Sequence, residues 1–434
     1  MANMTAREQL MLELINRARM DPRGEAERLD VTLSAGQGKP VPVLAGNDAL
    51  RASAFNHSGW MLLNDRLTIT ETKGSDSFIA ATPIERMRAY GYSLSGAYSY
   101  GENVSWAGEP DVPDFTASIL AQHESLFASA GNRARMLDAN FQEAGIGQQA
   151  GAFVHGGTTY IASMVTQDFI RSGARVFITG VIYDDTGLAN HSYDLGEGTA
   201  SRRVSSRGVK ADMSGAGGGY ELQFGSSGIK TVTFRQPGDD LKLDVLLGTA
   251  NVKVDAVDGS EIWTNGSVQS QSVAITELHA LGVSQLVLIG SAAAETIVGN
   301  RAVNQLLGLG GGDTISGRGG ADTIAGGAGG DVLAGGGGAD VFAYTAIKES
   351  RAQAPDTIAD FGVGADRIEL SALFAGTLTY RGEAPINGAH QVSVSADGGD
   401  VVVHINLHGT LADDMRIVLQ ATSLGAMTAG DFVL

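Results

Sequence analysis

Nine-residue repeats between positions 290 and 343 constrain the fold of this 434-residue chain more than any other feature. Each repeat starts with a glycine, carries an acid or amide five residues later, and places a large apolar residue two positions further on. The pattern G-G-x-G-x-D-x-U-x, where U is apolar, predicts a parallel β-roll with one very short strand in each repeat. The acids and amides are Glu295, Asn304, Asp313, Asp322, Asp331 and Asp340, and the apolar residues are Ile297, Leu306, Ile315, Ile324, Leu333 and Phe342.

The chemistry of one repeat indicates calcium as the ligand of its turns. Glycine-rich turns allow φ above zero and bring carbonyl oxygens inward. Calcium takes about six to eight oxygen ligands, which carboxylates and carbonyls supply together. Because one repeat forms half a coil, turns on the same edge lie two repeats apart. We therefore expect Asp313 to share an ion with Asp331, and Asp322 to share one with Asp340.

The first two repeats fit the pattern less well. Because an amide brings no charge, Asn304 should form a weaker pair with Asp322. The pair of Glu295 with Asp313 is the most doubtful, since residues 290–294 lack the inner glycines. The alternative interpretation of the whole segment is a glycine-rich disordered linker. A linker does not keep an apolar residue in phase, so we favour the roll and expect the linker state only without metal.

Composition supports this interpretation and limits the partners. The chain has 48 Asp and Glu against 30 Lys and Arg, and its net charge of −18 disfavours nucleic acid and anionic membranes. It has no cysteine, so no disulfide supports the fold. It has no run of 18 apolar residues, which predicts no transmembrane segment. The first seven residues lead into an amphipathic helix without the apolar stretch of a secretory signal.

Several C-terminal segments, 335–344, 355–361, 366–373 and 428–434, carry a family resemblance. They resemble the C-terminal region of repeat-in-toxin (RTX) proteins and serralysin-type exoproteins. The resemblance implies a protein that leaves the cytosol unfolded through the type I secretion machinery and folds in extracellular calcium. Extracellular calcium modules have a Kd on the order of 10⁻⁴–10⁻³ M, so they stay empty in the cytosol. Glu349 and Asp356 resemble a further calcium pair of that family, with solvated surface acids as the alternative.

The N-terminal residues carry a second resemblance, which is distributed over short segments in a characteristic order. The matching segments are 14–19, 54–61, 101–104, 129–133 and 144–147. They are similar to the bacterial branch of the CAP superfamily, the SCP domain shared by cysteine-rich secretory proteins, antigen 5 and pathogenesis-related 1. The resemblance implies an α-β-α sandwich. It also implies an extracellular binding role, because relatives have been linked to sterols or lipids in an apolar cleft.

The cleft of that family often holds two histidines and two acids that bind a divalent metal. This chain departs from that set. The segments that match the two histidines read Leu67-Thr-Ile69 and Gly131-Asn-Arg133, and one of the acids falls near Ser129. Only Glu102 remains. The loss of three of the four ligands argues against a metal in the cleft.

Two functions from different classes stay open. The first is a secreted, calcium-loaded binding protein whose head takes an extracellular ligand, such as a small apolar molecule, a lipid or a surface component. The alternative is an extracellular hydrolase that uses Glu102 with His57 or His123. Structural roles compete with this alternative, since His57 also fits a hydrogen-bonded core histidine and Glu102 fits an acceptor of backbone N–H groups. The serralysin protease reaction is not expected, because the chain has no His-Glu-x-x-His motif.

The predicted fold class is therefore multidomain. Residues 176–265 alternate short β-type segments with Gly, Asp and Ser turns, which predicts a small antiparallel β-sandwich. The predicted parts are a CAP-like head over 1–175, the sandwich over 176–265, the RTX β-roll over 266–343, and a β-rich C-terminal cap over 344–434.

Overall fold

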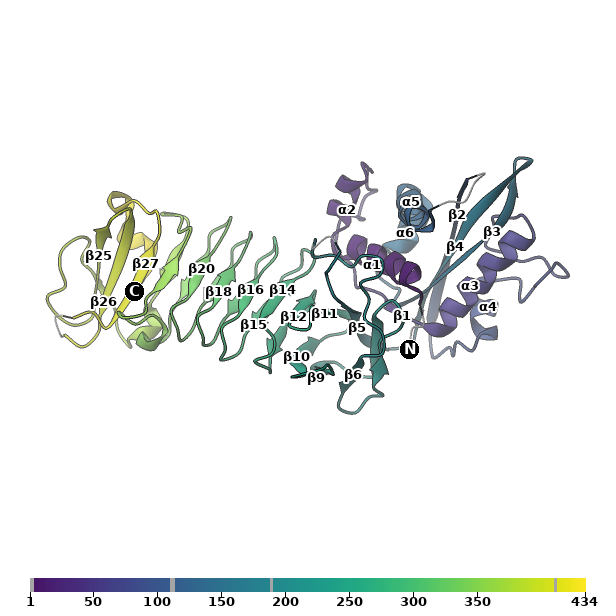
Figure 1. Cartoon of the computed structure of the whole chain (residues 1–434). Coiled ribbons are helices and arrows are strands. Elements are labelled where there is room, and N and C mark those ends of the chain that lie inside the picture. The colour runs from purple at the N-terminus through teal and green to yellow at the C-terminus, as the bar shows by residue number, and fades with distance from the viewer. Residues whose placement is uncertain (1–3, 110–113, 188–189, 410–411) are drawn as a thin grey trace. The chain divides into compact units, whose positions relative to one another are not determined.

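A computed structural model describes residues 4–109, 114–187, 190–409 and 412–434 (Figure 1). The chain divides into two compact units. Unit 1 holds residues 1–239 and 246–259, and unit 2 holds residues 240–245 and 260–434. The finer four-part division stays a prediction. Within the described ranges, none of the helices has both the length and the apolar character that a membrane crossing requires.

The N-terminal part of unit 1 is an α/β structure built on a small sheet (Figure 1). Strand β4 lies between β2 and β3 and is antiparallel to both, while β1 pairs with β3 in parallel. The strands are β1 (Ala45–Gly46), β2 (Tyr98–Glu109), β3 (Glu143–His155) and β4 (Thr158–Ser172). The helices are α1 (Ala6–Met20), α2 (Pro22–Arg28), α3 (Asp48–Leu63), α4 (Pro83–Ala89), α5 (Phe115–Ala128) and α6 (Ala130–Met136).

Helix α3 packs unusually close to strand β3. A Cβ atom on Gly145 or Gly147 would lie 2.1 or 2.0 Å from the backbone of α3, so only glycine permits this approach. Further along, Trp60 and Met61 of α3 pack in a buried cluster with Phe153 of β3. This contact fixes the position of His57, which lies on the same helix. On the other helical layer, α5 contacts β2 and β4.

The remaining strands of unit 1 form mixed sheets, which corrects the expected antiparallel sandwich. Strand β5 (Val176–Tyr183) is antiparallel to β8 (Gly219–Phe224) but parallel to β11 (Val252–Val257). Parallel pairing needs a long crossover between the two strands, and residues 184–251 supply one. Sequence alternation detects the strands but does not determine their direction. Elsewhere in the unit, β6 (Arg203–Ser206) is antiparallel to β7 (Asp212–Met213) and to β9 (Gly228–Phe234).

Unit 2 is dominated by very short parallel strands that stack into two facing sheets (Figure 1). Each repeat contributes one strand, and each of β16 to β19 pairs with the strand 18 residues further along the chain. The predicted half coil per repeat is therefore confirmed. The repeat strands are β16 (Thr296–Val298), β17 (Gln305–Leu307), β18 (Thr314–Ser316), β19 (Thr323–Ala325), β20 (Val332–Ala334) and β21 (Val341–Ala343).

The core of the roll is a stack of single apolar side chains. All six predicted apolar residues, from Ile297 to Phe342, have no exposed surface. The same stack continues outside the repeats, through Leu278 and Leu288 on one side and Ile358 and Ile368 on the other. Because a three-residue strand buries only one large side chain, each coil depends on its neighbours for a core.

The parallel ladder is longer than the predicted range 266–343. On the N-terminal side it includes β12 (Glu261–Thr264), β13 (Val268–Ser270), β14 (Glu277–Ala280) and β15 (Val287–Ile289), and β10 (Leu241–Leu247) pairs with β13 in antiparallel fashion. On the C-terminal side it includes β22 (Asp356–Ile358), β23 (Arg367–Glu369), β27 (Met415–Leu419) and β28 (Phe432–Val433).

A small sheet completes the C-terminal part of unit 2. Strands β25 (Gln391–Asp397), β26 (Asp400–Asn406) and β27 form an antiparallel meander, and β24 (Thr379–Tyr380) pairs with β25 in parallel. Short 3₁₀ turns at Ile347–Glu349, Ser371–Leu373, Leu424–Ala426 and Ala429–Asp431 join these strands. The meander attaches to the roll through the pairing of β27 with β22.

Two adjacent glycines provide a matched test of the turn geometry. Gly338 has φ +154°, and a Cβ atom there would lie 1.6 Å from the carbonyl oxygen of Gly320, whereas a Cβ on Gly337 meets nothing within 4 Å. We predict that Gly338→Ala destabilises the roll by about 2–4 kcal/mol, through strain and overpacking. The measurement is chemical denaturation in calcium, followed by far-UV circular dichroism. Gly337→Ala is the control, and equal losses for both variants would contradict the turn geometry.

Candidate functional site

Buried carboxylates form a ladder along each edge of the roll. In every step, Oδ1 of one aspartate accepts the backbone N–H of the acid or amide on the preceding coil of the same edge. On one edge the acceptors Asp313, Asp331 and Asp356 lie 2.8, 2.8 and 3.0 Å from the nitrogens of Glu295, Asp313 and Asp331. On the other edge the acceptors Asp322, Asp340 and Asp366 lie 2.7, 2.8 and 2.9 Å from the nitrogens of Asn304, Asp322 and Asp340.

The second carboxylate oxygens of this ladder lack a hydrogen-bond donor. Among the described residues, Oδ2 is buried without a hydrogen-bond partner in the aspartates Asp313, Asp322, Asp331, Asp340 and Asp356. A buried carboxylate oxygen without a donor is costly unless a proton or a cation compensates it. The ladder therefore presents a row of oxygens that can accept a cation.

A glycine lies next to Oδ2 of Asp313, Asp322, Asp331 and Asp340. A Cβ atom on Gly308 would lie 2.1 Å from Oδ2 of Asp313 and 2.4 Å from the carbonyl oxygen of Gly326. The next repeat has the same arrangement on the opposite edge, with Gly317 next to Asp322. These two turns thus bring a carboxylate oxygen and a carbonyl oxygen of the following coil close together around a glycine. An all-oxygen donor set of this kind fits a hard cation such as calcium.

The ladder carboxylates are easier to protonate than ordinary acids. Burial raises the pKa of Asp313 to about 7, and the neighbouring charges of Asp331 and Glu295 act in the same direction. Burial also raises the pKa of Asp322 to about 6 and that of Asp356 to about 8. These shifts mean that burial in the turns disfavours the charged form of the carboxylates. A bound cation would favour the charged form.

The other predicted ligands lie in less regular surroundings. Glu295 folds back on its own turn, where the backbone and hydroxyl of Ser291 bind its two oxygens. Oδ1 of Asn304 accepts the N–H of Asn300 at 2.8 Å. Glu349 accepts both the N–H and the hydroxyl of Thr345 at 2.6 Å, so local bonds already occupy its carboxylate. The structure therefore places Asp356, but not Glu349, in the carboxylate ladder.

Two residues of the ladder system were missed in the sequence. Asp366 ends one edge by accepting the N–H of Asp340, and Asp360 accepts the N–H groups of Gly335 and Gly336 at 2.9 and 2.8 Å. The step length grows from 18 residues within the repeats to 25 and 26 residues at the ends of the two edges. A search with a fixed spacing cannot find these acids, although both stand before or after short apolar strands as the repeat acids do.

Glu102 belongs to a buried charged cluster in unit 1. The guanidinium Nη2 of Arg86 lies 2.8 and 2.7 Å from the two oxygens of Glu102. His57 Nε2 lies 3.5 Å from Glu102 Oε1, and His57 Nδ1 lies 3.0 Å from Glu71. The fifth member is Asp168, which faces Glu102 in the register of β2 and β4. At most 4 % of any of these residues is exposed, so the cluster is closed to solvent.

Burial sets the protonation of this cluster. It raises the pKa of Glu102 well above the usual range, and the neighbouring Asp168 carboxylate acts in the same direction while Arg86 opposes it. Burial also raises the pKa of Asp168. The pKa of Glu71 is lowered, because hydrogen bonds from His57 and from the backbone outweigh the effect of burial. The arrangement therefore joins helix α3, helix α4 and the sheet through charged hydrogen bonds.

His123 does not join this cluster, so the predicted group of Glu102, His57 and His123 is not assembled. His123 Nε2 lies 2.9 Å from Glu25, and its Nδ1 has no hydrogen-bond partner among the described residues. Glu25 in turn binds Arg17 at 2.9 Å and contacts Arg28. The physical reason is helix packing, because α5 and α1 contact each other and α2 follows α1 directly.

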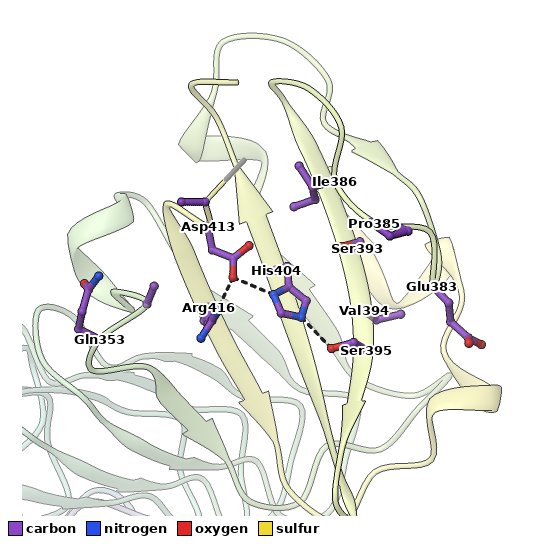
Figure 2. Close-up of a pocket in the computed structure, with 12 residues that line it drawn as sticks. Gln353, Glu383, Pro385, Ile386, Ser393, Val394, Ser395, His404, Asp413 and Arg416 are labelled. Carbon is purple, nitrogen blue, oxygen red and sulfur yellow. Dashed lines mark hydrogen bonds and ion pairs between the residues drawn. The ribbon is translucent and has the colours of Figure 1, made fainter. Parts of the chain in front are cut away.

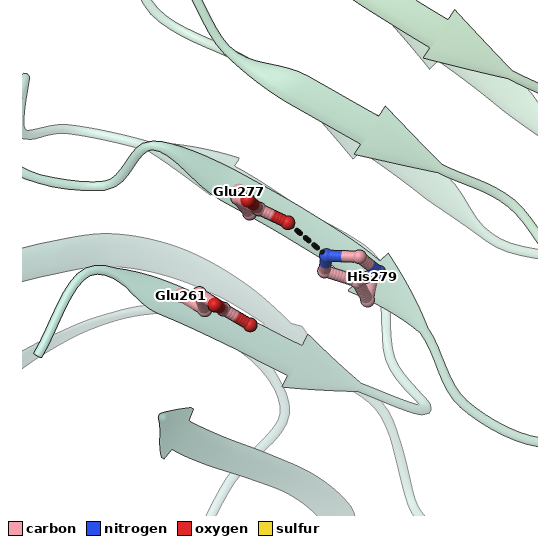
Figure 3. Close-up of side chains that lie close together, drawn as sticks. All are labelled: Glu261, Glu277 and His279. Carbon is pink, nitrogen blue, oxygen red and sulfur yellow. Dashed lines mark hydrogen bonds and ion pairs between the residues drawn. The ribbon is translucent and has the colours of Figure 1, made fainter. Parts of the chain in front are cut away.

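Three further possible metal ligands lie together on β12 and β14 (Figure 3). Single donor atoms of Glu261, Glu277 and His279 lie within 4.8 Å of one another. His279 Nε2 lies 2.7 Å from Glu277, and the indole of Trp263 stacks on the His279 ring with centroids 4.1 Å apart. These side chains face away from the core, because Ile262 and Leu278 on the same strands are fully buried.

Comparison with known protein families explains the C-terminal part of the chain. A family model described as peptidase M10 serralysin C terminal matches residues 296–434. This segment is a serralysin-type C-terminal domain. Serralysin C-terminal repeats are a calcium-binding family. The match begins at strand β16, so unit 1 and the first coils of the roll lie outside it.

Solved structures with some similarity come from two bacteria. The AlgE6R3 subunit of the Azotobacter vinelandii mannuronan C5-epimerase is 31 % identical, with 33 % of this chain and 80 % of that chain covered and a TM-score of 0.28. An extracellular protein with an SCP domain from Bacillus anthracis str. Ames is 19 % identical, with 38 % and 40 % covered and a TM-score of 0.25. The comparison with curated proteins found no match.

The contact of His123 with Glu25 predicts an acid-sensitive step in unit 1. Burial alone would raise the pKa of Glu25, but hydrogen bonds from His123 and Arg17 outweigh it and lower the pKa from 4.5 to about 2. A lowered pKa stabilises the folded state above the unfolded value, so this contribution is lost as pH falls from about 4.5 through 2. We predict that Glu25→Gln costs about 2–3 kcal/mol at neutral pH and removes this acid-dependent loss.

The measurement is chemical denaturation between pH 7 and pH 2 in a Trp263→Phe background. In that background the fluorescence comes from Trp60 and Trp106, which both lie in unit 1. Glu124→Gln is the control, because Glu124 is an exposed acid on α5, next to His123. An unchanged acid dependence in Glu25→Gln would contradict the assignment.

Proposed function

We propose that the chain is a secreted calcium-binding protein whose repeat region folds when calcium fills its turns. The observation that carries this proposal is the row of buried Oδ2 atoms without a donor, from Asp313 to Asp356. The serralysin-type family match over residues 296–434 supports the same conclusion. No described side chain donates a hydrogen bond to these oxygens, so a cation is the simplest source of compensation.

The proposed ligands follow the two edges of the roll. Asp313 with Asp331, and Asp322 with Asp340, are the principal pairs. Asp356 continues the first edge. The weaker predicted ligands are Asn304, Glu295 and Glu349, each of which already has local hydrogen bonds. When bound, calcium would supply positive charge to the carboxylates, while the residues of the chain hold the turns in the shape that brings their oxygens together.

This chemistry makes folding depend on the compartment. Without the cation, the turns contain buried carboxylates that repel one another around a core only one side chain wide per strand. Extracellular calcium modules bind with a Kd on the order of 10⁻⁴–10⁻³ M, so cytosolic calcium leaves them empty. An unfolded repeat region is suited to the type I secretion machinery, which we propose as the export partner. The folded protein would then be extracellular or associated with the cell surface.

A calcium titration tests this proposal. We predict that metal-free protein in EGTA lacks the β-structure of the repeats and gains it at millimolar calcium, as followed by far-UV circular dichroism. The double variant Asp322→Asn, Asp340→Asn keeps the Oδ1 acceptors but loses two charges. Its folding midpoint should rise to roughly tenfold higher calcium.

The control is Asp397→Asn, because Asp397 is exposed and lies outside the ladder. Its midpoint should match that of the natural sequence. A spectrum that does not change across the titration would contradict calcium-dependent folding. Equal midpoints for the ladder variant and the control would contradict the assignment of these ligands.

For the head we propose binding of a small apolar ligand, in line with its resemblance to the CAP superfamily. Supporting this is a groove of ≈ 550 Å³ between α3 and β3. Its apolar lining includes Leu62, Leu63 and Val154, and Leu63 and Val154 are 63 % and 41 % exposed. Exposed aliphatic side chains around a hollow favour an apolar ligand such as a lipid chain.

The hydrolase alternative is less well supported. His57 Nε2 lies 3.5 Å from Glu102 Oε1, but both residues are buried and Arg86 donates to both oxygens of the Glu102 carboxylate. His123 is bound to Glu25. A general base needs access to substrate or water, so we assign this cluster a structural role and propose no reaction in it.

A fatty-acid probe tests the head groove. We predict that cis-parinaric acid binds the calcium-loaded chain, and that Leu63→Arg weakens binding roughly tenfold because a charge replaces apolar contact area. Leu120→Arg is the control, since Leu120 is 43 % exposed on α5 and lies outside the groove. The fluorescence of the probe reports the binding. Equal affinities for the two variants would exclude this groove as the binding site.

A further inference from the structure

The small C-terminal sheet contains a hollow of ≈ 660 Å³ that the calcium proposal does not use (Figure 2). Strands β25 and β26 form one wall, and the segments around residues 352–353 and 383–386 line the rest. The lining combines the apolar Pro385, Ile386 and Val394 with the charged Glu383 and Arg416. A hollow of this size with mixed lining can admit a small organic molecule.

A chain of hydrogen bonds runs along one wall of this hollow (Figure 2). Ser395 Oγ lies 2.8 Å from His404 Nε2, and His404 Nδ1 lies 2.8 Å from Asp413 Oδ2. Arg416 Nε lies 2.5 Å from the same Asp413 oxygen. The order is therefore hydroxyl, imidazole, carboxylate, with both imidazole nitrogens engaged.

The sheet register explains why these residues meet. His404 on β26 stands directly opposite Ser393 on β25 and opposite Arg416 on β27. Ser395 lies two residues beyond Ser393, so it shares the same face of the sheet. Asp413 comes from the connection that enters β27. Antiparallel pairing therefore positions Ser395 and His404, and hydrogen bonds with His404 and Arg416 position Asp413.

We propose that Ser395, His404 and Asp413 form a nucleophile, base and orienting acid that act on small esters in this hollow. A hydroxyl within hydrogen-bond reach of an imidazole, which a third group orients, is the arrangement that activates a serine nucleophile. Access supports the proposal, because the side chains of His404 and Asp413 are 20 % and 12 % exposed and all three residues line the hollow. The buried His57 cluster of unit 1 lacks this access.

The proposed reaction balances without a cofactor. Ser395 Oγ bonds to the ester carbonyl carbon while its proton passes to His404 Nε2. His404 then gives that proton to the departing alcohol, which leaves an acyl group on Ser395. A water molecule then attacks this acyl group while His404 takes one of its protons. The bond between the acyl carbon and Ser395 Oγ breaks, the carboxylic acid departs, and His404 returns the proton to Ser395 Oγ. Asp413 accepts the Nδ1–H bond throughout and holds the imidazole in the required tautomer.

A fluorophosphonate probe with a fluorescent tag tests the nucleophile directly on the calcium-loaded full chain. Its phosphorus bonds to an activated serine oxygen, fluoride leaves, and the serine proton passes to the base. We expect mass spectrometry to place the label on Ser395. Ser395→Ala should abolish labelling, and His404→Gln should slow it roughly 100-fold or more. Asp413→Asn should slow it less than His404→Gln.

Ser371→Ala is the control, because Ser371 is an exposed serine of unit 2 that lies outside the hollow. Its labelling rate, and its rate of 4-nitrophenyl acetate hydrolysis, should equal those of the natural sequence. Absence of label on the natural protein, label on Ser393 in place of Ser395, or unchanged labelling of His404→Gln would each overturn the proposal. Circular dichroism in calcium checks the fold of the variants, and the position of the label on the natural protein decides the matter if a variant does not fold.

Discussion

The hydrogen bond from a backbone N–H to an aspartate Oδ1 on the next coil of the same edge is the interaction on which the repeat region depends. It joins successive coils on both edges of the roll at 2.7–3.0 Å. By engaging Oδ1, it leaves Oδ2 turned toward glycines and carbonyl oxygens. One bond therefore fixes the stacking of coils and leaves the second carboxylate oxygen without a donor at the same time. If these carboxylates bind calcium as proposed, stability and calcium binding cannot be separated, because the same carboxylate serves both.

Much of the roll could be predicted from the sequence, because its contacts repeat at a constant separation. The phase of the apolar residues gave the core, and half a coil per repeat gave the pairing of Asp313 with Asp331. The prediction ended where the spacing changed. Asp356 was found only through a family resemblance, and Asp366 was missed because an insertion lengthens its step to 26 residues. The parallel direction of β11 relative to β5 could not be predicted from the alternation of apolar residues, since parallel and antiparallel strands share the same period of two.

The head shows the opposite case, in which residues far apart in sequence determine the site. Glu102 could be selected from the short segment 101–104, but its partner Arg86 lies in no recognised motif and belongs to helix α4. Asp168 reaches the cluster only through the register of β2 and β4. His57 and His123 look alike in the sequence, as single histidines on amphipathic helices. The packing of α1, α2 and α5 distinguishes the two histidines. It brings His123 into contact with Glu25, whereas His57 contacts Glu71 and Glu102.

The buried carboxylates of the two units differ in the partners that the chain gives them. In the head, Arg86 binds Glu102 and His57 binds Glu71, whereas neither carboxylate oxygen of Asp168 has a hydrogen-bond partner among the described residues. In the roll, the described residues offer no donor to Oδ2 of the ladder aspartates, so the counter-charge must come from solution. Under the calcium proposal, folding of the roll depends on the cation, whereas Glu102 and Glu71 of the head are held by contacts within the chain.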